Sequence, residues 1–151
     1  MCIRDSVYTD GACSNNGKLN AKAGIGVYFQ DDDSRNVSKK ITGKQTNNRA
    51  ELLAIIVAYF IIENDVERGM TIVICTDSEY AIRCFTSYGE KCDRQGWKKE
   101  IPNKDIVQQG YSLFKGKPNI WLKYVRAHTG ATDVHSIGNA KADALATQCL
   151  L

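Results

Sequence analysis

The sequence is poor in the residues and patterns that define several specialised classes of protein. Only 2 of its 151 residues are proline and 12 are glycine, which excludes collagen-like and low-complexity chains. Its longest apolar run, residues 52–62, is shorter than the about 20 residues that cross a bilayer. The 20 basic residues exceed the 17 acidic ones by only 3, a balance that permits a polyanionic partner without demonstrating one. What remains is a globular composition, with 43% hydrophobic and 25% charged residues.

Cysteine motifs for metals and features of secretion are also missing. The six cysteines include no Cys-x-x-Cys pair, and His128 and His135 are the only histidines that could join them, so a zinc cluster is not expected. Residues 1–10 contain Arg4, Asp5 and Asp10 and no apolar stretch, unlike a secretory signal. We therefore expect reduced thiols in an intracellular compartment, cytoplasmic or nuclear, and no association with a membrane.

The length fits one domain, since domains usually have roughly 100–200 residues. No internal repeat or linker divides the chain. Arg4 and Asp5 lie where a central strand would favour apolar side chains, so residues 1–6 are interpreted as a non-native or disordered leader. We expect residues 7–151 to form a single domain.

The hydrophobic pattern changes its period along the chain. Short apolar or β-branched runs bounded by turn residues predict strands at 7–10, 23–29, 37–42, 71–76 and 120–125. Apolar residues at helical spacing predict helices at 50–61, 78–85, 103–114 and 136–150. Three strands joined by short loops, followed by helical crossovers, predict an α/β fold. Its five-stranded mixed sheet would have three antiparallel strands, then two parallel ones, with helices on both faces.

Four acidic residues are notable for their positions in this pattern. Asp10 and Asp77 each end a predicted strand, Glu51 opens the long helix, and Asp143 lies within the last helix. Taken singly, each has an ordinary explanation as a turn residue, a helix cap or a partner of the helix dipole. Ligands of open α/β sheets bind at the carboxyl ends of strands, so two of these carboxylates should meet at one edge. Clustered carboxylates need protons or cations, and oxygen-rich sites suit magnesium or manganese.

These carboxylates lie within segments that together resemble the type 1 ribonuclease H family. The segments follow the family's order and extend over residues 7 to about 147, which makes the ordered set much more specific than any single motif. They are Val7-Tyr8-Thr9-Asp10-Gly11-Ala12-Cys13, Thr46-Asn47-Asn48-Arg49-Ala50-Glu51-Leu52, Thr76-Asp77-Ser78, Ala127-His128-Thr129-Gly130 and Gly138-Asn139-Ala140-Lys141-Ala142-Asp143-Ala144-Leu145-Ala146.

The resemblance implies a ribonuclease H catalytic domain, an endonuclease that cleaves the RNA strand of RNA–DNA hybrids and leaves 5′-phosphate and 3′-hydroxyl ends. Asp10, Glu51, Asp77 and Asp143 match the family's metal-binding carboxylates, which hold two Mg²⁺, with Mn²⁺ as a substitute. One ion, shared by Asp10 and Asp143, would activate water, and the other would stabilise the leaving 3′ oxygen. His128 matches a loop histidine that assists proton movement or release of product and metal, whereas His135 has no family counterpart.

The resemblance also implies three sets of contacts with nucleic acid. Asn16, Asn47 and Asn48 match positions that contact the minor groove. Lys44, Thr46 and Asn103 match a pocket that grips a DNA phosphate, although such residues are also ordinary turn and cap residues. The family's basic protrusion corresponds to a charged stretch that could equally be a solvated face, made of Lys91, Arg94, Trp97, Lys98 and Lys99.

This sequence departs from the family pattern in three places. Tyr88 and Cys92 stand where the family usually has tryptophans that line its DNA channel. The segment between Trp97 and Asn103 is short, and the segment from His128 to Asp143 is longer than in many relatives. These departures weaken the comparison for the basic protrusion and for His128 more than for the carboxylates.

Three other interpretations stay open. A non-catalytic nucleic-acid-binding module on the same fold would be expected to lack one carboxylate, and all four are present. A ribonuclease H domain of a reverse-transcribing polyprotein would have the same motifs. A nuclease for branched DNA would have less use for asparagine-rich loops that read 2′-hydroxyls. We expect an RNA–DNA hybrid as the partner and a monomeric protein.

Overall fold

A mixed β-sheet forms the centre of the protein in a computed structural model, which describes residues 4–127 and 132–151. The strands are β1 (Arg4–Ser14), β2 (Lys22–Tyr28), β3 (Val37–Lys40), β4 (Thr71–Thr76) and β5 (Ile120–Tyr124), in the order β3-β2-β1-β4-β5. The pairs β1–β2 and β2–β3 are antiparallel, whereas β1–β4 and β4–β5 are parallel. The predicted topology is therefore confirmed.

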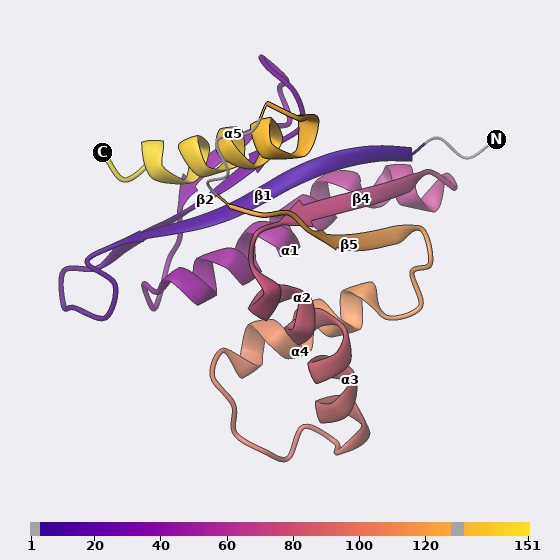
Figure 1. The fold of residues 1–151 in the computed structure, drawn as a ribbon. Helices are drawn as coiled ribbons and strands as arrows, with labels where there is room; N and C mark the ends of the chain where they lie inside the picture. Colours follow the sequence, from indigo (N-terminus) through magenta and orange to yellow (C-terminus); the bar gives the residue numbers. More distant parts are fainter. Residues whose placement is uncertain (1–3, 128–131) are drawn as a thin grey trace.

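Helices cover both faces of this sheet, as expected (Figure 1). Four helices lie on one side: α1 (Asn47–Glu67), α2 (Glu79–Phe85), α3 (Ser87–Arg94) and α4 (Lys104–Phe114). The last helix, α5 (Val134–Gln148), crosses the opposite face over β1 and β2. The sequence predicted two helices between β4 and β5. The structure has three there, and the prediction missed α3.

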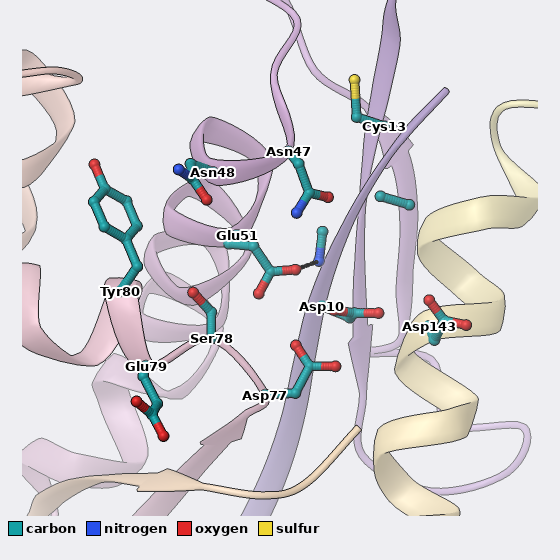
Figure 2. A pocket seen from close by; sticks show the side chains of 12 residues that line it. Asp10, Cys13, Asn47, Asn48, Glu51, Asp77, Ser78, Glu79, Tyr80 and Asp143 are labelled. Carbon is teal, nitrogen blue, oxygen red and sulfur yellow. Dashed lines mark hydrogen bonds between the residues drawn. The ribbon is translucent and has the colours of Figure 1, made fainter. Parts of the chain in front are cut away.

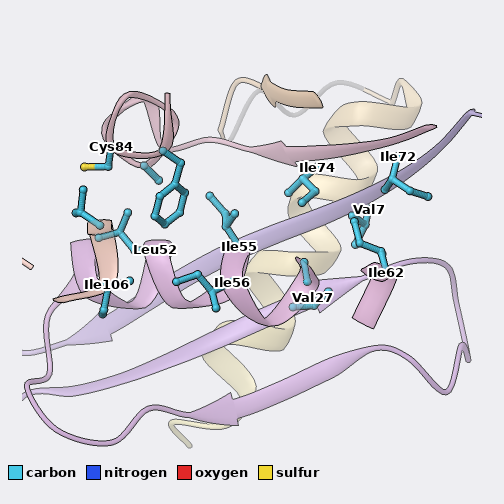
Figure 3. Close-up of a cluster of buried hydrophobic side chains, with 14 of the residues drawn as sticks. Val7, Val27, Leu52, Ile55, Ile56, Ile62, Ile72, Ile74, Cys84 and Ile106 are labelled. Atoms are coloured by element: carbon cyan, nitrogen blue, oxygen red, sulfur yellow. The ribbon is translucent and has the colours of Figure 1, made fainter. Parts of the chain in front are cut away.

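The α1 face of the sheet holds the main hydrophobic core (Figure 3). Leu52, Ile55 and Ile62 of α1 are completely buried and pack with Val7 of β1 and Ile74 of β4. The helix begins at Asn47 because the hydroxyl of Thr46 caps it by accepting a hydrogen bond from the Arg49 N–H. Glu51 therefore lies in the second turn of α1 and does not open it, which corrects the predicted boundary.

The opposite face allows an unusually close approach between α5 and the sheet. A β-carbon at Gly24 or Gly26 of β2 would overlap backbone atoms of α5, and one at Gly138 of α5 would overlap the ring of Tyr8. Gly26 pairs with Asp10 across the sheet and lies against the carbonyl of Ala142. Because these glycines have no side chains, Ala142, the residue before Asp143, packs directly against β2.

The beginning of the chain differs from the predicted leader. Residues 4–6 belong to β1 and pair in parallel with Thr71, Ile72 and Val73 of β4, so the first strand begins before residue 7. Asp5 is exposed at this end of the strand, which explains why a polar residue is tolerated there.

Two further features bear on the environment of the protein. In the described ranges no disulfide bond forms among Cys13, Cys75, Cys84, Cys92 and Cys149. No helix among the described residues is long and apolar enough to cross a membrane.

Candidate active site

Four carboxylates from separate elements face one open pocket of about 490 Å³ (Figure 2). Asp10 projects from β1, Glu51 from α1, Asp77 from the residue after β4, and Asp143 from α5. The parallel pairing of β1 and β4 ends at Thr9 and Thr76, so Asp10 and Asp77 follow side by side at the same edge of β4. The expected convergence of these two carboxylates is present. Asp10 lies within β1, which continues to Ser14 by pairing with β2, and this corrects the predicted end of the strand.

Three of the four carboxylates form a compact group. Asp10, Glu51 and Asp77 each offer one oxygen, and these oxygens lie within 4.8 Å of one another. Asp143 enters from the α5 side of the pocket and lies outside this group. The position of α5 therefore decides how closely the fourth carboxylate approaches the other three.

Burial places a large electrostatic cost on this group. Asp10 and Glu51 are each only 4% exposed. Burial raises the pKa of Glu51 to about 7, with Asp77 and Asp143 adding to the rise, while hydrogen bonds from Asp10 and the Gly11 N–H oppose it. Burial, followed by the interaction with Glu51, raises the pKa of Asp10 well above its usual range. Protons or cations must therefore neutralise the group near neutral pH.

The chemistry of the donors fits a divalent cation. Glu51 accepts a hydrogen bond from the Gly11 N–H through Oε1, whereas its other carboxylate oxygen, Oε2, is buried and, with Asp10 ionised, meets no donor among the described residues. A buried acceptor without a partner is costly, and coordination of a cation would remove that cost. Carboxylate oxygens are hard ligands that suit Mg²⁺ or Mn²⁺. Asp10, Glu51 and Asp77 are thus able to hold such an ion.

A second pocket of about 360 Å³ adjoins the first. It contains all six residues that the resemblance assigned to the minor groove and the DNA phosphate: Asn16, Lys44, Thr46, Asn47, Asn48 and Asn103. Asn47 and Asn48 also line the carboxylate pocket, so the two pockets lie side by side and share these residues. We call the first the carboxylate pocket and the second the amide pocket.

The walls of the amide pocket are tied together by polar contacts. Asn16 Oδ1 accepts a hydrogen bond of 3.1 Å from the Asn47 N–H, which joins the β1–β2 loop to the start of α1. Arg49 forms a two-pronged ion pair with Asp105, with a shortest N–O distance of 2.8 Å, which joins α1 to α4. Asn103 Nδ2 donates to Tyr80 Oη at 3.2 Å. These contacts hold the segments around the amide pocket in fixed positions relative to one another.

The predicted basic protrusion lies apart from both pockets. Lys91, Arg94, Lys98 and Lys99 are exposed at and after the end of α3. Trp97 packs on the domain, because its indole N–H donates to Asp93 at 3.1 Å and its ring lies 6.3 Å from that of Tyr111. Within the described ranges, none of these five residues lines the carboxylate or the amide pocket.

Two histidines complete the comparison with the sequence. His128 lies outside the described residues, so its predicted role stays a prediction. His135 was given no role, yet it contacts Tyr8 and Lys123 beside the start of α5. Asn139 lies within a quoted motif but was given no role; it precedes Asp143 by one turn, and its buried Oδ1 has no hydrogen-bond partner among the described residues. Tyr8 also lies within a motif without a role of its own, His135 lies in none, and only their proximity in the fold connects them.

The strand order, the helices on both faces and the carboxylates that line one pocket together define a ribonuclease H-like α/β protein. The family model described as RNase H matches residues 4–150, and the chain belongs to this family. A Ribonuclease H of Schizosaccharomyces pombe is 38% identical over 148 residues, which cover 95% of this chain and 52% of the relative. A Ribonuclease H of Francisella tularensis subsp. novicida is 35% identical and is covered over 88% of its length.

The chain spans about half the length of several relatives, including the one from Schizosaccharomyces pombe. Among solved structures, the PFV RNase H domain superposes with a TM-score of 0.74 at 24% identity, covering 95% of this chain and 92% of that domain. This structural similarity supports the fold.

Proposed function

We propose that this protein is an endonuclease that hydrolyses the RNA strand of RNA–DNA hybrids and leaves 5′-phosphate and 3′-hydroxyl ends. The observation that carries the proposal is that the two pockets are neighbours. A group of carboxylates lies beside a pocket lined with amides and a lysine, and Asn47 and Asn48 line both, in a chain of the RNase H family.

The carboxylates would bind two Mg²⁺, or Mn²⁺ in their place. Asp10, Glu51 and Asp77 would hold one ion, and Asp10 and Asp143 the other. Such ions, when bound, activate water and neutralise the leaving oxygen of a phosphodiester. The Gly11 N–H orients the Glu51 carboxylate by a hydrogen bond, and burial under α1 keeps water away from one side of the group. His128 would assist proton movement or product release.

The amide pocket would recognise the hybrid by shape. Asn16, Asn47 and Asn48 offer amide donors and acceptors suited to 2′-hydroxyls and base edges in a wide minor groove. Lys44, Thr46 and Asn103 would bind a phosphate of the DNA strand, which fixes register without reading sequence. The shared residues Asn47 and Asn48 would place the RNA strand over the carboxylates while the DNA strand lies across the amide pocket.

The basic stretch after α3 would add affinity along the backbone. Lys91, Arg94, Lys98 and Lys99 project into solvent, where they are free to meet phosphates. Trp97 would support this stretch by packing, because its indole N–H is already bound to Asp93.

We further propose that the protein acts as an intracellular monomer. The lack of disulfide bonds among the described cysteines is consistent with a reducing compartment. The presence of all four carboxylates around one pocket favours an enzyme over a non-catalytic binding module. A domain of a reverse-transcribing polyprotein would share the same site and the same chemistry.

A cleavage assay tests the proposal. Labelled hybrid, double-stranded RNA and double-stranded DNA are incubated with the protein, with Mg²⁺ or with excess chelator, and the product ends are analysed. We expect cleavage of the RNA strand of the hybrid alone, only with metal, and ends that a polymerase extends without further treatment. Asp77→Asn should be inactive, and the exposed Asp32→Asn serves as the matched control. Full activity in chelator, or equal cleavage of all three substrates, would overturn the proposal.

A further inference from the structure

The helix that carries Asp143 is attached to the sheet near its start by a chain of three polar side chains. His135, in the first turn of α5, lies with Nδ1 3.0 Å from Tyr8 Oη and with Nε2 3.3 Å from Lys123 Nζ. A lysine ammonium group only donates hydrogen bonds, so Nε2 accepts from Lys123. The proton of the neutral ring is therefore on Nδ1, which donates to Tyr8. This chain joins α5 to β1 and β5 at one point.

Tyr8 is a fixed partner for this contact. It is 4% exposed, and its ring lies against Gly138 of α5, 5.9 Å from the ring of His135 and 6.4 Å from that of Tyr28. Burial raises the pKa of Tyr8 to about 12, so its hydroxyl stays protonated at any physiological pH. Tyr8 and Asp10 are two residues apart on β1, so their side chains lie on the same face of the sheet.

The remainder of the first turn contributes little apolar contact. Val134 and Ile137 are 74% and 45% exposed, and Asp133 caps the helix by accepting from the Ser136 N–H. Asp143 follows His135 by eight residues, or about 12 Å along the helix axis at 1.5 Å per residue. A shift at the start of α5 would therefore pass along a rigid helix to Asp143, the carboxylate that lies outside the compact group.

We propose that His135 is a positioning residue that, through its hydrogen bond to Tyr8, seats the start of α5 and so sets how closely Asp143 approaches Asp10. The inference rests on the proposed function, since it concerns the divalent ion that Asp10 and Asp143 would share. His135 touches neither substrate nor metal in this proposal. It acts through the helix, and its loss should affect metal binding more than binding of the hybrid.

Binding of Mn²⁺ without substrate, measured by calorimetry, tests the inference independently of cleavage. His135→Ala should weaken Mn²⁺ binding about tenfold, the lower end of the range for residues that orient metal ligands. Tyr8→Phe removes only the hydroxyl and should have a similar effect. His135→Asn places an amide donor near the position of Nδ1 and should restore binding, whereas His135→Gln, which places its amide near Nε2, should not.

Two controls separate positioning from general damage. Lys123→Ala leaves the contact between His135 and Tyr8 and should bind Mn²⁺ as the parent does. In an Asp143→Asn background, His135→Ala should cause no further loss, because the two changes act on the same ion and are not additive. Melting temperatures of all variants show whether any of them is unfolded.

Kinetics with the hybrid supply a second measurement. At limiting Mg²⁺, His135→Ala should lower kcat while leaving KM for the hybrid unchanged, and high metal should restore much of the loss. Unchanged Mn²⁺ affinity in folded His135→Ala, or an equal further loss in the Asp143→Asn background, would overturn the inference. If the parent binds Mn²⁺ but does not cleave the hybrid, the proposed function is wrong. The role of His135 is still decided by the calorimetric comparison of Mn²⁺ binding.

Discussion

The carboxylate pocket and the amide pocket adjoin each other, yet they are built in opposite ways. The first takes its charged groups from the two central strands and from helices on both faces, and it buries Asp10 and Glu51 almost completely. The second consists of neutral amides, a threonine and a lysine from loops and helix starts. Without a cation, the buried carboxylates of the first pocket lower the stability of the fold. The polar residues of the second pocket carry no such cost, because water can hydrate them.

This difference assigns separate tasks to the two pockets. Groups that are costly to bury are retained where chemistry needs concentrated charge, and such groups act on the rate. Groups that are ordinary caps and turn residues bind the ground state and the transition state alike, and such groups act on affinity. Thr46 illustrates the second kind, since it caps α1 and lines the amide pocket at the same time.

The sharpest separation should come from removing one charge from the carboxylate group. Asp10→Asn or Asp77→Asn should lower kcat for the hybrid about a thousandfold, since a catalytic metal supplies several kcal/mol of charge stabilisation. KM should change little. Single-turnover cleavage at saturating hybrid measures this effect, with Asp32→Asn as the control. A loss confined to KM would remove the proposed division between the pockets.

A smaller loss of turnover is expected at His128, which would move protons and bind no metal. His128→Ala should lower kcat about a hundredfold, the lower part of the range for acid–base catalysis, and leave measurable activity. The pH profile of kcat compares this variant with the parent. A loss as large as that of Asp10→Asn would instead mark His128 as a metal ligand.

Removing charge from the basic stretch should change affinity alone. Changing Lys91, Arg94, Lys98 and Lys99 to alanine should raise KM for the hybrid and reduce the log–log salt slope by about 0.9 for each phosphate that is no longer neutralised. Turnover at saturating substrate should stay the same. Arg68→Ala with Lys117→Ala, at the far end of α1, forms the control. An unchanged salt slope would show that the basic stretch binds no phosphate, and that Lys44, Thr46 and Asn103 alone do so.

The smallest effect concerns stability without metal. Because burial raises the pKa of Glu51 from 4.5 to about 7, the folded protein holds a proton that the unfolded chain releases. This stabilisation is fully present below about pH 4.5 and is lost as the pH rises through about 7. The melting temperature in chelator should therefore fall by several degrees over this range, since about 2–4 °C corresponds to 1 kcal/mol.

The fold also holds Asp10 protonated, at a cost that grows as the pH rises, so Asp10→Asn removes that cost and should reverse much of the fall. Its melting temperature in chelator at pH 8 should exceed that of the parent, and its pH dependence should be flatter. Differential scanning calorimetry of both proteins from pH 5 to 8 gives the comparison. A variant less stable than the parent at every pH would show that Asp10 is needed for the fold.

The sequence predicted that Asp10 and Asp77 meet because each follows an apolar run. The parallel pairing of β1 and β4 places them at one edge of β4, although β1 itself continues past Asp10 to Ser14. The motif order supplied Glu51 and Asp143, whose approach to that edge depends on packing. The six residues that the resemblance assigned to nucleic acid line one pocket, and their contacts with a hybrid stay a prediction.

Other features could not be read from the pattern. Helix α3 has only 8 residues, contains Gly89 and has charged side chains at half of its positions, so it offers few apolar residues from which to predict a helix. The first strand begins at Arg4 because pairing with β4 continues past the apolar residues. The contact between Tyr8 and His135 joins residues 127 positions apart, and no local signal predicts such a pair.

A mutation at Gly26 would disturb the carboxylate pocket although Gly26 itself has no side chain. It pairs with Asp10 and lies beneath Ala142, the neighbour of Asp143, where even a β-carbon would overlap the backbone of α5. Every glycine codon becomes an alanine codon by a single base change. At position 26 that change would add a methyl group between β2 and α5 and so move Asp143 away from Asp10. A lineage could therefore lose this site while all four acidic residues remain in its sequence, and a census of acidic residues alone would count such a chain as intact.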